Sequence, residues 1–248
     1  MSLDGSYGVL PWLAVEARLV LRVVDTTPTY FEQDGTPKLV PNDIHHHDET
    51  LVGPGDPWLV ARFGGRFGKL ATAARLGVSF PLGSTAPDPY ALGYEGKWHE
   101  HTQLGTGTFV PIAGLGLSYD TGLVDLSLSF LGLFSVYENE HGYRAPARYF
   151  VGARAGLPLL DRRLTPFVTV DVAHETDEIW HGAPGLEGAT RRTDLLVGAG
   201  LAWEFVPDWT LEVGARGRVL KLSTSPGFDS PGLVQLALST HFDTLGRR

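Results

Sequence analysis

Strict alternation of apolar and polar residues, over segments of about ten residues, is the feature that most constrains how this chain can fold. An alternation of period two places successive side chains on opposite faces of a β-strand. The clearest segment runs from residue 13 to residue 23, and similar segments run over 69–80, 195–205 and 209–219. In the first segment one face carries Leu13, Val15, Ala17, Leu19, Leu21 and Val23, and the other carries Glu16, Arg18 and Arg22.

The length of these segments separates two kinds of β-protein. Strands of globular sheets usually have about 5–6 residues, whereas a tilted strand that crosses a bilayer needs about 9–11. Short connections alternate with long ones along the chain, so all the long ones fall at one end of an up-and-down barrel. We therefore expect one domain, residues 1–248, with extracellular loops at about 25–57, 82–107, 138–147, 175–192 and 223–231.

The strand count is eleven, although single-chain bacterial barrels normally have an even number. We therefore expect an all-β, antiparallel, up-and-down transmembrane β-barrel of about 12 strands. A strand lost upstream, or one hidden within 25–57, would explain the difference. The first residues, MSLDGSYGVLPW, contain neither a basic region nor an apolar run, so we expect a signal already removed or a late start.

Composition excludes several classes of function. No apolar run approaches the roughly 18 residues of a membrane-spanning helix. The formal charge of −8 argues against a nucleic-acid partner, and the lack of cysteine excludes thiolate chemistry. No nucleophile elbow, phosphate loop or zincin motif is present, so we expect that the protein is not an enzyme.

Three Gly-rich stretches resemble a bacterial outer-membrane family described as putative transporters of the meta-pathway of phenol degradation. The stretches are Phe80-Pro81-Leu82-Gly83-Ser84, Leu104-Gly105-Thr106-Gly107-Thr108-Phe109 and Gly114-Leu115-Gly116-Leu117-Ser118-Tyr119. In that family a strand ends in a Pro-x-Gly turn, and a Leu-Gly-Ser/Thr-Gly step opens the next strand after a variable loop. The resemblance implies an outer-membrane barrel that passes small molecules.

If the apolar faces meet lipid, the opposite faces line a lumen. Ion pairs between its charges could fill a narrow interior, and we favour this structural interpretation over a constriction selective for a small polar or anionic solute. The charged side chains expected in the lumen are Glu16, Arg18, Arg22, Arg62, Arg75, Asp125, Arg154, Asp171, Glu204, Glu212, Arg216 and Arg218.

Histidines concentrate in or beside the expected outer loops, together with carboxylates. Imidazole and carboxylate groups suit Cu or Zn, although polar outer loops often carry histidine by drift, and we weigh that ordinary explanation slightly higher. The candidate ligands of a shared metal site are His45, His46, His47, His99, His101, His141 and His181.

The sequence thus predicts a barrel in the bacterial outer membrane that contacts lipid and acts as a channel or uptake barrel for a small solute, linked to a metal through its outer loops. The alternative is a plugged, non-transporting barrel whose loops bind a metal or a partner. The facing assignment can be stated at single residues. A charge at Val197 should meet hydrocarbon, whereas serine at the inward-facing Gly198 should be tolerated.

Overall fold

The computed structural model describes all residues except 28, 33, 39–47, 186–190, 222–231 and 242–248. Eleven long strands follow one another in chain order around a single antiparallel sheet, as the alternation predicted. The strands are β1 (Ser2–Leu10), β2 (Leu13–Thr26), β6 (Trp58–Phe67), β7 (Leu70–Ser79), β8 (Val110–Asp120), β9 (Asp125–Leu133), β11 (Arg148–Gly156), β12 (Leu164–Glu175), β15 (Arg192–Val206), β16 (Trp209–Lys221) and β17 (Gly232–Thr240).

A twelfth strand, β5 (Glu49–Pro54), lies within the segment that we expected to be loop. It pairs with the second half of β2, from Leu21 to Thr26, while β6 pairs with the first half of the same strand, from Leu13 to Arg18. β5 and β6 therefore form one long strand interrupted at 55–57. Pro54 and Pro57 lack the N–H donors that an unbroken ladder needs, which accounts for the interruption. β5 is thus a strand within 25–57, which was one of the two explanations for the odd strand count.

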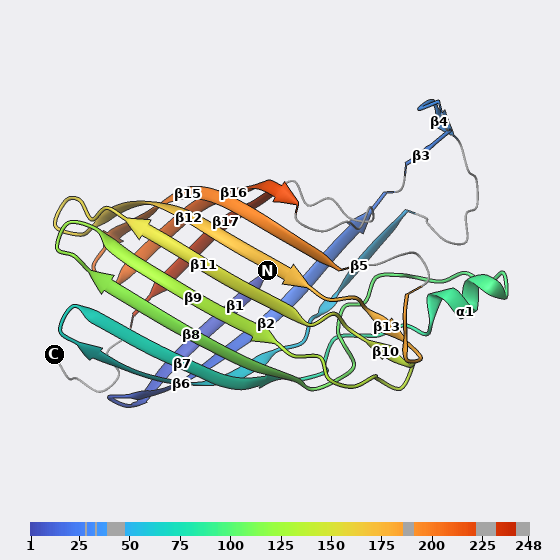
Figure 1. The fold of residues 1–248 in the computed structure, drawn as a ribbon, viewed down its shortest axis with the longest axis horizontal. Helices are drawn as coiled ribbons and strands as arrows, with labels where there is room; N and C mark the ends of the chain where they lie inside the picture. Colours follow the sequence, from blue (N-terminus) through green and yellow to red (C-terminus); the bar gives the residue numbers. More distant parts are fainter. Residues whose placement is uncertain (28, 33, 39–47, 186–190, 222–231, 242–248) are drawn as a thin grey trace.

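The two ends of the strands differ in their connections (Figure 1). At the end that we call the turn end, two-residue turns join β1 to β2, β6 to β7 and β15 to β16. Gly68 and Asp208 adopt positive φ in two of these turns. At the opposite, loop end, long segments carry α1 (Pro89–Tyr94), β10 (Tyr143–Arg144), β13 (Ile179–Trp180), β14 (Ala183–Pro184) and the hairpin β3 (Tyr30–Phe31) and β4 (Pro37–Lys38).

Because eleven strands alternate in direction, the edge strands β1 and β17 run the same way, from the loop end to the turn end. In the described part of the chain these two edges are not paired with each other. The predicted loop at 223–231 lies outside the described residues. Of the other expected loops, 82–107 contains α1, 138–147 contains β10, and 175–192 contains β13 and β14.

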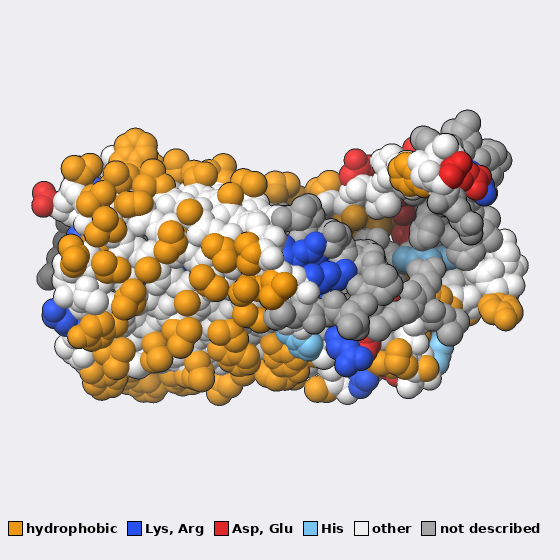
Figure 2. Space-filling view, turned by 45° about the horizontal axis from the view of Figure 1, so that its top comes forward, with side chains coloured by type: hydrophobic (Ala, Val, Ile, Leu, Met, Phe, Trp, Pro, Cys, Tyr) orange, Lys and Arg blue, Asp and Glu red, His pale blue; other side chains and the backbone are white. Residues whose placement is uncertain are grey.

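The outer surface of the sheet is apolar, as a lipid-facing barrel requires (Figure 2). Leu115 on β8 is 59% exposed and Val168 on β12 is 56% exposed, although both lie in the middle of their strands. Charged side chains gather near the ends instead. Trp12, Trp203 and Trp209 are also exposed beside the short turns, where an aromatic girdle meets the membrane interface. No helix among the described residues is long and apolar enough to span a membrane.

The expectation that serine is tolerated at Gly198 was wrong. A Cβ atom at Gly198 would lie 2.5 Å from the Ala215 carbonyl oxygen and 2.5 Å from Cγ of Arg216. Both neighbours belong to the adjacent strand β16, so the side chain of residue 198 has no room. The alternation assigned this glycine to a face, but it could not reveal how closely β16 approaches.

We predict that Leu115→Arg and Gly116→Ser differ sharply in their effect on stability. Leu115 faces outward, so arginine there should cost about 2–4 kcal/mol near the bilayer midplane. A Cβ atom at Gly116 would meet nothing closer than 3.9 Å, so serine should cost little. Refolding titrations into lipid vesicles measure both. Equal costs at the two positions would contradict the facing of β8.

Candidate functional site

The inner face of the barrel has two walls of different character. On β11, β12, β15 and β16, which we call the packed wall, inward-facing charges pair across strands. Arg154 Nη1 lies 3.0 Å from Glu212 Oε2, and Arg216 Nε lies 3.3 Å from Asp171 Oδ2. Arg218 Nη1 lies 3.7 Å from Asp194 Oδ1. Opposite charges at such separations lower each other's cost of leaving bulk water.

Phe167 fills the space between these ion pairs. The Arg154 guanidinium carbon lies 3.5 Å from the centroid of the Phe167 ring, a cation–π contact. Gly200 on the next strand is required here, because a Cβ atom at that position would overlap the ring. The packed wall is thus held by aromatic packing as well as by charge.

The wall formed by β1, β2, β6 and β7 is more open. The Glu16 carboxylate bridges two arginines, at 2.7 Å from Arg62 Nε and 2.8 Å from Arg75 Nε. Arg18 pairs with Asp4 on β1, and its guanidinium carbon lies 4.6 Å from the centre of the Trp58 ring. One carboxylate therefore serves two cations at the middle of this wall, which leaves a local excess of positive charge.

Two cavities lie along this open wall, and a third lies at the turn end between the β6–β7 hairpin and the strands β8, β9 and β11. The largest, about 820 Å³, is lined by Glu16, Arg18, Trp58, Arg62 and Arg75. A second, about 390 Å³, shares Arg62 with it, and a third, about 340 Å³, shares Arg66 with the second. The three cavities therefore follow one another from the middle of the lumen to the turn end. Seven Lys and Arg side chains but only four carboxylates line them.

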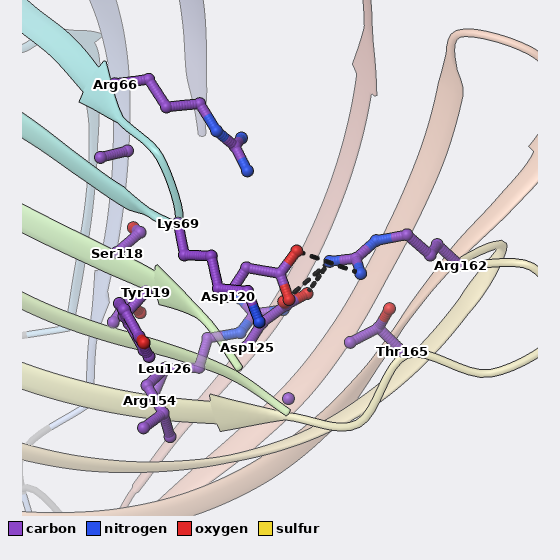
Figure 3. Close-up of a pocket in the computed structure, with 13 residues that line it drawn as sticks. Arg66, Lys69, Ser118, Tyr119, Asp120, Asp125, Leu126, Arg154, Arg162 and Thr165 are labelled. Carbon is purple, nitrogen blue, oxygen red and sulfur yellow. Dashed lines mark hydrogen bonds and ion pairs between the residues drawn. The ribbon is translucent and has the colours of Figure 1, made fainter. Parts of the chain in front are cut away.

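At the turn end, Arg162 reaches across the third cavity (Figure 3). Its Nη2 lies 2.7 and 2.6 Å from the two oxygens of Asp125, and its Nη1 lies 3.5 Å from Asp120 Oδ2. The turn that presents it has three successive residues, 160–162, with positive φ. The two aspartates raise the pKa of Arg162, so this link stays charged throughout the physiological range.

The loop end of the lumen is covered by the segment 82–107. Arg22 Nη1 on β2 donates hydrogen bonds to the carbonyl oxygens of Gln103 and Leu104, at 2.9 and 3.2 Å. Asp56, at the interruption between β5 and β6, accepts hydrogen bonds from Gly83 N at 2.9 Å, Thr106 N at 2.7 Å and Thr106 Oγ1 at 2.8 Å. Leu104 is buried beneath this arrangement. Both ends of the segment are thus fastened to the barrel.

The charges predicted to line the lumen therefore fall into three settings. The packed wall holds Arg154, Asp171, Glu212, Arg216 and Arg218, the open wall holds Glu16, Arg18, Arg62 and Arg75, and the two ends hold Arg22, Asp125 and Glu204. Glu204 caps a turn, since its Oε1 accepts a hydrogen bond from Asp208 N.

Sequence reasoning did not single out Asp56, Phe167 or Arg162. Asp56 and Arg162 lie in connections, where alternation carries no information about facing. Phe167 belongs to the inward face of β12, and an apolar residue there broke the polar half of the pattern. That break was the signal that could have indicated a packed interior.

His99, His101 and His181 lie at the loop end near a small aromatic core of Tyr143, Ala145 and Trp180, against which Tyr90 packs. The rings of His99 and His101 lie 5.0 Å apart, and His101 packs edge-on against Tyr90. His181 Nε2 lies 3.3 Å from Asp88 Oδ2, at the start of α1. Three outer segments thus meet at this aromatic core.

Among the described residues, no three histidines, aspartates or glutamates are arranged to hold a metal ion. His141 lies 3.8 Å from Glu140, its neighbour in sequence. His45, His46 and His47 lie outside the described residues. The shared Cu or Zn site therefore stays a prediction.

Two groups at the loop end have displaced pKa values. Desolvation raises the pKa of Glu100 to about 7, and a hydrogen bond and charge from Glu49 on β5 act in the same direction. A proton shared between the two carboxyl groups adds to the effect of desolvation. Burial also raises the pKa of the Tyr143 hydroxyl, with Glu178 acting in the same direction.

These features define an antiparallel membrane β-barrel with an apolar outer surface, a charged lumen and a covered loop end. No family model and no curated protein sequence matches the chain. Nineteen chains of solved structures match it. One is the crystal structure of the Pseudomonas putida toluene transporter TodX, with a TM-score of 0.43 and 14% identity over 98% of this chain and 73% of that chain. The resemblance to the phenol-degradation family stays a prediction.

We predict saturable binding of Cu(II) or Zn(II), with micromolar or tighter affinity at about pH 7.5, mostly lost at about pH 5.5 as the imidazoles protonate. Changing His99 and His101 together to Ala should weaken it. His241→Ala, at the turn end, serves as the control. Calorimetry on metal-stripped protein decides. The predicted metal site would be contradicted if no saturable binding were found, or if His241→Ala weakened binding as much as the His99 and His101 changes.

We also predict that the loop-end cover is tighter in acid than in base. The pKa of Glu100 is raised in the folded protein, so folding of this segment binds a proton. Stability of the cover should therefore fall as the pH rises from about 4.5 to about 7 and level off above that. Hydrogen exchange of residues 82–107, corrected for intrinsic rates, measures this. Glu100→Gln should flatten the dependence, and an unchanged dependence would contradict the shared proton.

Proposed function

We propose that the protein is a channel or uptake barrel that carries a small polar solute across a bacterial outer membrane. The observation that carries this proposal is the series of cavities of about 820, 390 and 340 Å³ within the lumen. A barrel whose interior served structure alone would be packed on all sides, as β11–β16 are around Phe167. The seven Lys and Arg side chains that line these cavities favour a hydrated solute over an apolar one.

The covered loop end supports a gated path. The segment 82–107 lies at the point where the series of cavities would otherwise open outward, and Asp56 fastens both of its ends with three hydrogen bonds. Bonds to a charged acceptor contribute roughly 1.5–3 kcal/mol each. A cover held by a few such bonds can open without disturbing the sheet. A metal bound by the outer histidines would act on the same cover.

A second function is supported by the same cover together with the ion pairs of the packed wall. In this alternative the lumen is permanently plugged and the outer loops bind a metal or a partner protein. The aromatic core of Tyr143 and Trp180 gives these loops a fixed shape that suits recognition. The two functions differ in whether ions cross the barrel.

We predict that Asp56→Ala raises the frequency of open-channel steps in planar bilayers, because Gly83 and Thr106 lose their shared acceptor. Asp34→Ala is the matched control. Asp34 also accepts hydrogen bonds from a threonine, Thr36 N at 2.9 Å and Oγ1 at 2.7 Å, but lies between β3 and β4. Electrical silence of wild type and of Asp56→Ala would reject transport in favour of the plugged barrel.

A further inference from the structure

The hairpin of β6 and β7 carries four cations toward the cavities: Arg62, Arg66, Lys69 and Arg75. Arg62 and Arg75 share Glu16. Among the residues that the structure describes, Arg66 and Lys69 have no carboxylate within ion-pair distance. Arg66 Nε donates to Gly68 O at 3.0 Å, and Lys69 Nζ donates to Thr121 O at 3.2 Å. The hairpin therefore sets four cations against a single carboxylate.

The position of the two unneutralised cations matters as much as their number. Both line the cavity of about 340 Å³ at the turn end, where Figure 3 shows them extending from the hairpin on the side opposite Arg162. The two aspartates of this cavity are both engaged by Arg162. An anion entering from the turn end would meet Arg66 and Lys69 first, and then the Arg62–Glu16–Arg75 group.

We propose that the β6–β7 hairpin is an anion-binding wall, which draws small inorganic and carboxylate anions from the turn end into the lumen. The proposal names the solute class for the function proposed above and rests on it for the passage of ions. It separates the two walls by their roles. On the packed wall Arg154, Arg216 and Arg218 each pair with a carboxylate and support the fold, whereas Arg66 and Lys69 of the hairpin line a cavity and have no carboxylate within ion-pair distance among the described residues.

The first test measures the reversal potential in planar bilayers under a gradient of KCl near 0.1 M. Wild type should prefer chloride over potassium by about threefold or more. A unit charge roughly 6 Å from an ion in water changes the local equilibrium concentration of that ion by about that factor. Arg66→Glu and Lys69→Glu should each lower the ratio by about threefold or more. At about 1 M salt the preference should shrink, because the screening length falls to about 3 Å.

Arg163→Glu is the matched control. It makes the same change of charge at the same end of the barrel, on an exposed residue that lines none of the three cavities. It should leave the ratio near the wild-type value. A conducting barrel that prefers potassium, or one in which Arg163→Glu acts as strongly as Arg66→Glu, overturns the anion-binding wall and leaves the channel function standing.

A second measurement decides the case of a silent barrel. Trp58 lines the largest cavity, so its fluorescence reports which ions enter. The emission of Trp58 is obtained as the difference in fluorescence between wild type and Trp58→Phe. Iodide should quench this emission more than caesium does, and Arg66→Glu should reduce the quenching by iodide. With no conductance, preferential iodide quenching rejects the channel but retains the anion-binding wall. Equal quenching by iodide and caesium rejects the wall.

Discussion

The structure depends on one constraint: every backbone N–H and C=O group inside a bilayer must find its partner within the protein. An antiparallel sheet that curves round on itself meets it with inter-strand hydrogen bonds, and each strand must then be long enough to cross the membrane. The registers from β6 through β15 run without a shift, and the register between β15 and β16 shifts only near the ends of the strands, at Leu195/Leu196 and at Glu204/Val206. Irregular backbone is confined to the ends, as at 55–57, where a proline removes a donor.

Once the sheet is fixed, side-chain facing follows, and this explains why the sequence predicted the fold well. Alternation depends only on local geometry, so the eleven strands could be counted and bounded to within a few residues. A strand within 25–57 was one explanation of the odd count, but β5 could not be placed because it is short and ends at Pro54. Gly198 shows a second limit of sequence prediction. Only glycine fits at this position because the neighbouring strand β16 lies so close, and the local pattern of residues contains no information about that strand.

The lumen could be predicted by residue type but not by role. Arginines alternate with apolar residues on both walls, and nothing local distinguishes Arg154, which pairs with Glu212 and packs on Phe167, from Arg66, which has no carboxylate partner among the described residues. That difference arises from which strands oppose each other across the barrel. The histidines met the same limit: the convergence of several loops could be foreseen, whereas the relative placement of their rings depends on the aromatic core around Trp180.

That aromatic core also bears on the order of assembly. Its members come from segments that follow β7, β9 and β12, so its contacts span most of the middle of the chain. Contacts between such distant residues form late, because the intervening strands must first be aligned. The cover over the lumen is therefore completed after the barrel wall. During insertion the interior would stand open at the loop end, and the barrel would become sealed only as its last folding step.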